Sequence, residues 1–425
     1  IPTMRDRAAQ ALAKQALEAQ WEAKFEPNSY GFRPGRCTHD AIEQIHKAIC
    51  RKPKYVLDAD ICKCFDRINH HALLAKLCVP RIMKHSIKGW LKAGIMEGHT
   101  LYPSEQGTPQ GGVISPLLMN IALHGLETTI INAFPKFKWQ NWPYRWRPQV
   151  IRYADDLVIL HHDLQTLEQA KAIAAGFLKD LGLEFKAEKT RITHTLNNIN
   201  EVAGFNFLGF YVRQYPGQCK QGFKSLVKPS KEGIGRHLAK IREILRTNKH
   251  VSQEELIGKL NPVINGWANY YQTVTSSKTF GKLDYLLRLN LIRWACRKHP
   301  KTGLRKIIRK YWRQCRFQTQ KGIGLTRYAD HHIVRHTKVQ AARSPFDGDL
   351  LYWASRMGKN PMLDPWKAKL LKQQRGICPW CGLYFKHGDI LETDHIVPTQ
   401  QGGKRNRNNL QLLHAHCHDS KTAAD

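Results

Sequence analysis

The chain has 425 residues, with 67 Lys and Arg against 34 Asp and Glu, and a formal net charge of +33 at pH 7. Hydrophobic residues make up 42% of it, which excludes a disordered basic tail and supplies enough apolar side chains for more than one buried core. A positive charge this large predicts a polyanionic partner, and nucleic acid is the commonest one.

We expect no secretory signal, because residues 1–7 contain no apolar core segment. The chain begins at Ile1 rather than Met, as if cut from a longer protein. The most apolar stretch, residues 113–119, is far too short to span a bilayer, so we expect no membrane partner. The odd count of 11 cysteines indicates a reducing compartment, where paired cysteines are metal ligands rather than disulfides.

Strand-like runs at residues 55–61, 150–160 and 205–212 lie among helical stretches in the first half of the chain. Ser230 then opens an amphipathic helix. Its apolar residues recur at helical spacing: Ile234, Leu238, Ile241 and Leu245. A second helix is predicted to begin at Ser252, with Glu255 completing a capping box.

Two adjacent carboxylates, Asp155 and Asp156, lie between β-rich runs, which predicts a hairpin with both at its tip. Adjacent Asp side chains repel unless a cation binds them. Asp60, at the end of the apolar run from residue 55, could join them to hold two Mg²⁺ ions. One ion would activate a primer 3′-hydroxyl and the other would neutralise the leaving pyrophosphate. Taken alone, the dipeptide is better explained as a simple polar turn.

Five further motifs accompany this hairpin in a fixed order. They are Tyr-Gly-Phe-Arg-Pro-Gly-Arg at 30–36, Phe-Asp-Arg at 65–67, Gly-Thr-Pro-Gln-Gly-Gly at 107–112, Glu-Lys-Thr at 188–190 and Phe-Leu-Gly-Phe at 207–210. With Tyr-Ala-Asp-Asp at 153–156, they resemble the reverse transcriptase of group II intron-encoded proteins. The resemblance implies that Asp60, Asp155 and Asp156 are the catalytic carboxylates. It also implies a fingers region before Ile1.

The same resemblance assigns nucleotide and template contacts. Phe65 would crowd the sugar 2′ carbon and select deoxynucleotides. Without the family resemblance, a Phe of the hydrophobic core would be the preferred interpretation. Gln110 and Gly111 would lie under the template and the incoming nucleotide, where glycine permits close backbone approach. Lys189 would lie near the triphosphate. A second tripeptide, Tyr-Ala-Asp at 328–330, lacks the second Asp and receives no catalytic role.

Residues 260–271 resemble the thumb, or maturase domain, of the same proteins. The stretch from 286 to 316 carries eleven cationic residues and no acidic one, with aromatic residues interleaved. The cationic residues are Arg288, Arg293, Arg297, Lys298, Lys301, Arg305, Lys306, Arg309, Lys310, Arg313 and Arg316. Such a helical block could grip phosphates and stack on unpaired bases of structured RNA. The alternative is a solvated charged face.

The last residues concentrate Cys and His. Cys378 and Cys381 form one C-x-x-C pair, and His414 with Cys417 forms a second pair of the same spacing. Two such pairs predict tetrahedral Zn²⁺ in a structural site, which would hold together a segment too short for its own core. His416 competes with His414 on spacing alone.

Other residues of this module resemble the HNH, or ββα-metal, endonuclease domain that commonly ends group II intron proteins. The resemblance implies that His395 is the general base and that Asp394 and His418 bind one catalytic divalent ion. Asn409 would hold the loop that orients His395. The alternative is a zinc-stapled DNA-binding ribbon without cleavage.

We therefore expect a multidomain α+β protein. Residues 1–225 would be a right-hand polymerase palm, an antiparallel sheet with helices, carrying the remainder of the fingers. Residues 226–315 would be an α-helical thumb or maturase domain, and 316–370 a basic DNA-binding linker. Residues 371–425 would be the small zinc-stapled HNH domain.

The expected function is that of a group II intron-encoded protein, which copies RNA into DNA, assists splicing and nicks target DNA. Its partners would be intron RNA, double-stranded target DNA and deoxynucleoside triphosphates, in bacterial cytoplasm or an organellar matrix or stroma. The oligomeric state stays open, with a dimer as one candidate. One alternative is an RNA-binding splicing factor with an inactive polymerase. Another is a stand-alone reverse transcriptase, which the maturase-like block and the HNH module disfavour.

Overall fold

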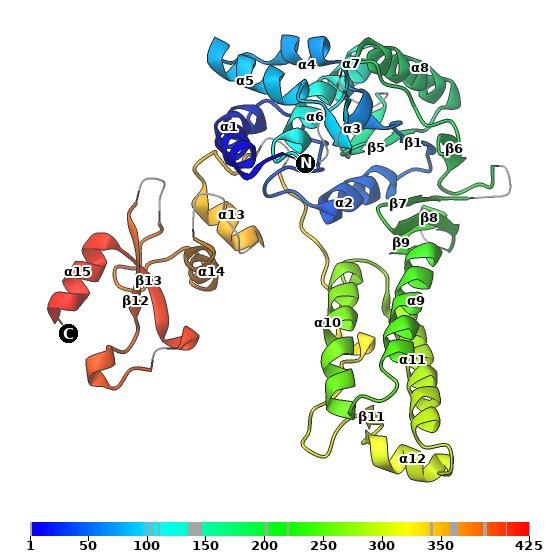
Figure 1. Ribbon diagram of the computed structural model, residues 1–425, viewed down its shortest axis with the longest axis vertical. Coiled ribbons are helices and arrows are strands. Elements are labelled where there is room, and N and C mark those ends of the chain that lie inside the picture. The colour runs from blue at the N-terminus through cyan, green and yellow to red at the C-terminus, as the bar shows by residue number, and fades with distance from the viewer. Residues whose placement is uncertain are drawn as a thin grey trace.

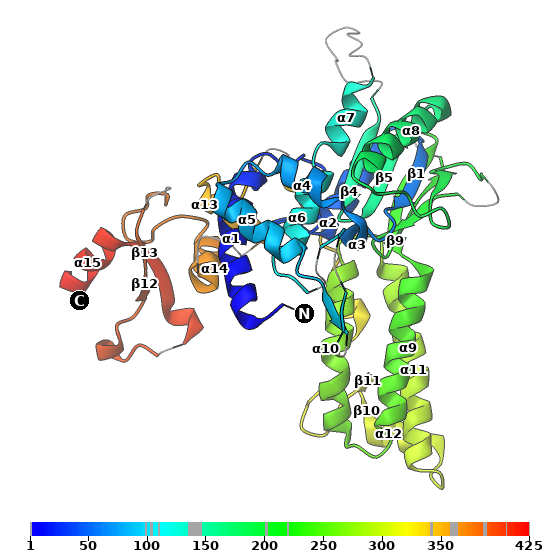
Figure 2. The same ribbon diagram turned by 45° about the horizontal axis from the view of Figure 1, so that its top comes forward.

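The computed structural model describes most of the chain. The described residues are 2–97, 100–102, 105–108, 111–134, 147–199, 203–218, 221–340, 343–357, 364–385, 389–404 and 406–424. The chain forms three parts, which we call the N-terminal unit (residues 2–229), the helical unit (230–330) and the C-terminal unit (364–424). Figures 1 and 2 show the helical and C-terminal units extending from the N-terminal unit in different directions.

The N-terminal unit is built on a four-stranded antiparallel sheet. Its order is β4 (Gln149–Tyr153), β5 (Asp156–His161), β1 (Tyr55–Asp60) and β6 (Arg191–His194). Successive side chains of a strand point to opposite faces. Val56 packs with helix α2 (Thr38–Ile49) on one face, and Leu57 with α7 (Leu126–Asn132) and α8 (Leu164–Asp180) on the other. Burial of both faces explains why these strands read as continuous apolar runs.

A second core packs around the turn between β4 and β5. Its helices are α1 (Met4–Glu22), α3 (Cys64–Arg67), α4 (His70–Lys76), α5 (Arg81–Leu91) and α6 (Ser115–Leu123). Strands β2 (Ile95–Glu97) and β3 (Thr100–Tyr102) pair as a separate ribbon.

The single run expected at 205–212 is wrong: it is a hairpin. Strands β7 (Phe205–Phe207) and β8 (Phe210–Pro216) pair across Leu208 and Gly209, and β9 (Phe223–Pro229) completes a three-stranded sheet. Both turn residues have positive φ, 50° and 82°, a conformation that a continuous strand does not contain.

The helical unit contains α9 (Lys231–Thr247), α10 (Gln253–Tyr271), α11 (Ser277–Lys298) and α12 (Leu304–Tyr311). They are followed by the short strands β10 (Trp312–Arg313) and β11 (Arg316–Phe317) and the turn η1 (Tyr328–Asp330). The expected cap of α9 is confirmed, since the Ser230 side chain accepts from the Gly233 amide. Ser252 caps α10, but Glu255 pairs with Lys259 at 2.9 Å rather than completing a capping box.

The C-terminal unit is a two-stranded antiparallel sheet with helices. Helix α13 (Leu350–Met357) precedes it, and α14 (Pro365–Gln373) packs on the sheet of β12 (Leu391–His395) and β13 (Leu410–His414). Two short turns, η2 (Thr399–Gln401) and η3 (Arg407–Asn409), and helix α15 (Ala415–Ala424) complete it. Within the described part of the chain, every helix is too short or too polar to cross a bilayer.

Two of the expected domain boundaries fall inside hairpins. The boundary at 225/226 cuts β9, and the boundary at 315/316 lies at the turn between β10 and β11. A division after Pro229, where α9 begins, keeps the three-stranded sheet whole. The helix start expected at Ser230 therefore marks the boundary better than residue 225 does.

The expected basic linker, 316–370, includes a segment that packs against α2. We call its described residues, 331–340 and 343–357, the strap. Val339 and Trp353 of the strap are fully buried. His336 Nε2 lies 3.0 Å from Asp40, whose side chain is fully buried in the first turn of α2. This part of the linker therefore has a packing role.

The ion pair of His336 with Asp40 makes stability depend on pH. Burial opposes the charged imidazole, but the hydrogen bond to Asp40 prevails and raises the pKa of His336 to about 9. A raised pKa means that its stabilisation is complete below about pH 6.5 and lost as pH rises through about 9. We expect His336→Gln to lower the thermal unfolding midpoint at pH 6 and to match the wild type at pH 10. A gap that stays constant with pH would contradict this.

Candidate functional site

The two acidic motifs meet at one edge of the four-stranded sheet. Asp60 is the last residue of β1 and pairs in register with Asp156, the first residue of β5. The backbone carbonyl of Asp155 accepts from the Ile61 amide at 3.1 Å. Asp60 and Asp156, 96 positions apart in the chain, are thereby fixed side by side. The expected hairpin is present, but its turn is Ala154 and Asp155, and Asp156 is the first residue of β5 rather than part of the tip.

These carboxylates form a region of concentrated negative charge. Burial raises the pKa of Asp156 to about 6, and the charges of Asp155 and Asp60 add to the rise. Burial also raises the pKa of Asp155, with Asp60 contributing. Lys189 offsets this charge from one side, since its Nζ donates to Asp60 Oδ2 at 2.5 Å. Oxygen ligands gathered against like-charge repulsion suit a hard divalent cation.

A buried polar network holds the turn of the hairpin in place. Ala154 has a φ of 58°, a strained conformation for a residue with a side chain. Arg152 donates to the Ala154 carbonyl at 3.1 Å and to Asn120 Oδ1 at 3.0 Å. Asn120 in turn donates to the Gly31 carbonyl. A Cβ on Gly31 would lie 2.3 Å from the Ala154 nitrogen, so only glycine permits this approach.

Phe65 lies in α3, the helix that follows Asp60 at the end of β1. Its ring meets that of Phe32 edge to face, with the centroids 6.1 Å apart. Its carbonyl accepts from the Thr108 amide at 2.6 Å, which docks the Gly-Thr motif onto α3. Gly111 is exposed with a φ of 81°, and Gln110 lies outside the described residues.

The helical unit separates its apolar and cationic side chains. Of the eleven cationic residues from 288 to 316, all are exposed except Lys298, which is half-buried. A groove of about 440 Å³ lies between α9 and α11. Six cationic side chains line it: Arg242, Arg246, Lys249, Arg293, Arg297 and Lys298. The Trp294 ring faces the Lys298 ammonium, and its Nε1 donates to the Asn248 carbonyl at 2.8 Å.

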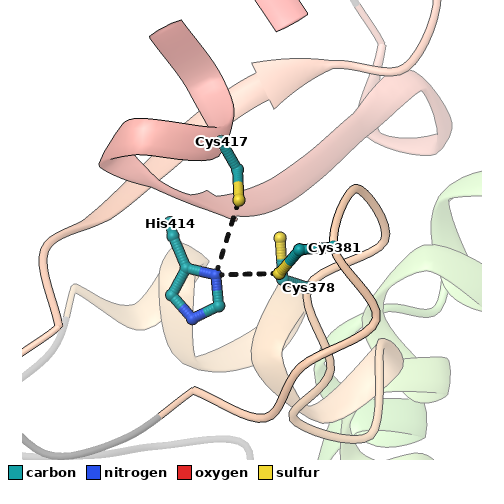
Figure 3. A group of neighbouring side chains, drawn as sticks. All are labelled: Cys378, Cys381, His414 and Cys417. Atoms are coloured by element: carbon teal, nitrogen blue, oxygen red, sulfur yellow. Dashed lines mark hydrogen bonds between the residues drawn. The ribbon is translucent and has the colours of Figure 1, made fainter. Parts of the chain in front are cut away.

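In the C-terminal unit the four expected zinc ligands converge (Figure 3). The ligand atoms of Cys378, Cys381, His414 and Cys417 all lie within 4.8 Å of one another. His414 presents Nδ1 to the sulfurs of Cys381 and Cys417, at 3.4 and 3.8 Å. Its Nε2 lies 3.3 Å from Asp389, the usual second partner of a metal-bound imidazole. Three thiols and one imidazole at these spacings fit a tetrahedral Zn²⁺.

The expected nuclease residues lie where β12 faces α15. Asp394 accepts from Gln411 at 2.9 Å and pairs with Lys421 at 2.8 Å. His418 pairs instead with Glu392 at 2.9 Å. The structure thus places Asp394 and His418 on facing elements, each with a different charged partner. His395 ends β12, and its carbonyl accepts from Lys421.

Asn409 clamps the loop that follows His395. Its side-chain oxygen accepts from the Val397 amide at 2.8 Å, and its Nδ2 donates to the Val397 carbonyl at 2.9 Å. Its backbone carbonyl accepts from the Ile396 amide. Asn409 thus holds the loop at Val397, and its expected role in orienting His395 stays a prediction.

Sequence reasoning missed three supporting residues. Arg152 and Asn120 hold the carboxylate hairpin, but nothing local in the sequence marks two polar residues that meet in a core. Glu392 had a usable signal. It lies two residues before Asp394 in a strand, so both side chains point to the same face.

Three family models match the chain. Residues 1–212 match "Reverse transcriptase (RNA-dependent DNA polymerase)", 234–312 match "Group II intron, maturase-specific domain" and 378–424 match "HNH endonuclease". Protein YkfC of Escherichia coli is 30% identical over 61% of this chain and 73% of its own length. The chain belongs to the group II intron-encoded reverse transcriptases. It combines reverse transcriptase, maturase and HNH endonuclease domains, as the sequence predicted.

Other relatives match over smaller shares of their length. The group II intron-encoded protein LtrA of Lactococcus lactis is 35% identical over 40% of this chain and 28% of its own. The putative COX1/OXI3 intron 2 protein of Saccharomyces cerevisiae is 25% identical over 92% of this chain and 52% of its own. A telomerase of Candida albicans aligns with a TM-score of only 0.37, too low to assign a shared fold.

Proposed function

We propose that this group II intron reverse transcriptase binds intron RNA, nicks a target DNA and extends the nicked end by copying the RNA. The observation that carries the polymerase role is the register of Asp60 with Asp156, which joins two distant acidic motifs. By this proposal the N-terminal unit is the palm with part of the fingers, and the helical unit is the thumb. The C-terminal unit is a ββα-metal nuclease.

At the palm, Asp60, Asp155 and Asp156 would hold two Mg²⁺ ions. Bound Mg²⁺ supplies charge neutralisation on the triphosphate and lowers the pKa of the primer hydroxyl. Lys189, already beside Asp60, would approach the triphosphate and protonate the leaving pyrophosphate. Phe65, backed by Phe32, would exclude a ribose 2′-hydroxyl by volume. Gln110 and Gly111 would support the template and the nucleotide.

In the nuclease, His395 would accept a proton from the attacking water, with Asn409 fixing its loop. Asp394 and His418 would hold one divalent ion beside the scissile phosphate, and their oxygen and nitrogen donors fit that task. In the structure, Lys421 pairs with Asp394 and Glu392 pairs with His418. Double-stranded DNA would be the substrate.

Primer extension tests the proposal against the alternative of an RNA-binding splicing factor. The assay supplies a DNA primer annealed to RNA, the four deoxynucleoside triphosphates and Mg²⁺. We expect incorporation by the wild type, with selection against ribonucleotides that weakens in Phe65→Ala. Binding of intron RNA without incorporation would instead favour the splicing factor. The expected locations, bacterial cytoplasm or an organellar matrix or stroma, remain predictions, as does the oligomeric state.

The zinc cluster yields a prediction with a built-in control. His414→Asn removes a ligand, so we expect the purified protein to lose about one equivalent of zinc and the C-terminal unit to unfold first on heating. His416 is exposed in the first turn of α15, outside the cluster of four ligands, and His416→Asn should retain the metal. Elemental analysis and calorimetry measure both. Zinc lost from the His416 variant and kept by the His414 variant would reassign the ligand.

The basic groove predicts the salt dependence of RNA binding. If Arg293 and Arg297 contact phosphates, the double substitution to Gln should lower the slope of log affinity against log salt by roughly 1 to 2. Lys240→Gln is the matched control, since the Lys240 ammonium on α9 pairs with Glu243 at 3.1 Å. Filter binding at several salt concentrations measures the slopes. Equal slopes for all three proteins would exclude the groove as a phosphate contact.

A further inference from the structure

The strap links the polymerase unit to the nuclease through packed contacts. Its anchor is Asp40 of α2, which accepts from the Val339 amide at 2.8 Å and from the Arg356 guanidinium in addition to His336. Arg356 is 316 residues from Asp40 in sequence, and the side chains of the pair are 5% and 0% exposed. A buried pair of this kind is strongly destabilised when one partner is removed.

A second anchor lies beside the first. The Trp353 side chain is fully buried against Gly35, where an added Cβ would lie 2.5 Å from the indole ring. Arg36 also donates to the Arg343 carbonyl at 3.2 Å. The residues Gly35 and Arg36 belong to the motif that precedes α2 and is continuous with Gly31 at the carboxylate hairpin. The strap is thus attached close to the structure that positions the catalytic carboxylates.

The connection continues into the zinc module. Helix α13 packs on α14, and α14 contributes Ala368 and Leu371 to the core that contains Cys378. Leu351 of α13 fits against Gly376, where a Cβ would lie 2.0 Å from its Cδ1. Packed side chains therefore connect α2 through α13 and α14 to the metal cluster. This connection is made by direct contact of α13 with α14 and does not rely on the chain segment that joins them.

Cys37, Asp40 and His336 also present ligand atoms close enough together to hold a metal ion. The Asp40 carboxylate, however, already has a guanidinium and an imidazole as partners, and the Cys37 amide donates to it at 2.9 Å. These donors satisfy the carboxylate, and the two cationic side chains more than offset its negative charge. The cluster is therefore a structural anchor, complete without an ion.

We infer that the strap holds the nuclease in a fixed position relative to the palm, so that the 3′-hydroxyl end of a nicked strand passes to the carboxylate site without leaving the protein. The inference rests on the proposed function. Its physical basis is effective concentration: a tethered and oriented end reaches the second site far more often than one released to solution. Trp353 and Arg356 are by this inference positioning residues, since their contacts are with Gly35 and Asp40 rather than with a proposed catalytic side chain.

A coupled assay tests the inference with Trp353→Ala combined with Arg356→Gln, and with Arg356→Gln alone. Arg335→Gln, an exposed residue of the strap, is the control. A target duplex, RNA template and nucleotides are supplied, and excess unlabelled DNA is added at the first turnover to capture released ends. We expect the fraction of nicks that are extended to fall by about tenfold in the double variant and to stay unchanged in the control.

Separate measurements distinguish a failure of this inference from a failure of the proposed function on which it rests. Nicking of duplex DNA and extension of an annealed primer should change by less than about twofold in both strap variants, because their catalytic residues are untouched. Small-angle scattering should show a larger radius of gyration for the double variant. An unchanged extended fraction, or unchanged scattering, would overturn the positioning role. Failure of the wild type to nick or to extend would overturn the proposed function itself, and the inference with it.

Discussion

Asp155→Asn is expected to reduce DNA synthesis by roughly 10²- to 10³-fold or more, because it removes a ligand from the proposed metal site. The fold should survive. Without metal, burial and the charges of its neighbours both disfavour the charged form of Asp156 and raise its pKa, so the variant should be at least as heat-stable as the wild type in chelator. Addition of Mg²⁺ should raise the unfolding midpoint of the wild type and not that of the variant.

Asp58→Asn is the matched control for this substitution. Asp58 lies on the same strand, two residues before Asp60, but its carboxylate pairs at 3.2 Å with Arg191 of β6, which borders β1 on the side opposite β5. We expect DNA synthesis by this variant to change by no more than about threefold. Equal losses in both variants would mean that general damage to the sheet, rather than a metal site, explains the effect. An active Asp155→Asn protein would remove Asp155 from the catalytic set.

His395→Ala is expected to reduce DNA nicking by roughly 10²- to 10⁴-fold, the range for loss of a general base. Zinc content and primer extension should be unchanged, because His395 lies outside the cluster of four ligands and in a different unit from the carboxylates. His416→Asn serves as the control here also. A supercoiled plasmid carrying the target sequence reports nicking as conversion to the open circle.

Asn409→Ala gives the complementary result for the same loop. Without its contacts to Val397, His395 should lose its orientation, and nicking should fall while zinc stays bound. If His395→Ala nicks normally, the C-terminal unit is a zinc-stapled DNA-binding ribbon, which is the alternative that the sequence left open.

Local pattern explains why much of the carboxylate site could be predicted. The turn at Ala154 and Asp155 is bounded by apolar strands, a pattern that predicts a hairpin. Asp60 ends a separate apolar run, which predicts a strand. The prediction that these two elements meet rests on the family resemblance, because the register between distant strands has no local signal in the sequence. The spacing of the zinc pairs is likewise local, and the structure selects His414 over His416.

Long-range packing explains what could not be predicted. The break at Leu208 and Gly209 needs a positive φ at a leucine, which composition does not reveal. The strap looked like a basic linker because its charges are frequent and its buried residues few. Its contacts with Asp40 join residues about 300 positions apart, and only the folded chain brings them together.

Anomalous diffraction from crystals with Mn²⁺ in place of Mg²⁺, an annealed primer and template, and a non-hydrolysable nucleotide tests most directly whether Asp60 and Asp155 share metal ions. We predict two manganese peaks between these carboxylates, next to the primer end and the triphosphate. Both peaks should be absent from crystals of Asp155→Asn. Manganese bound only elsewhere, with the nucleotide away from the β1–β5 edge, would contradict the polymerase assignment.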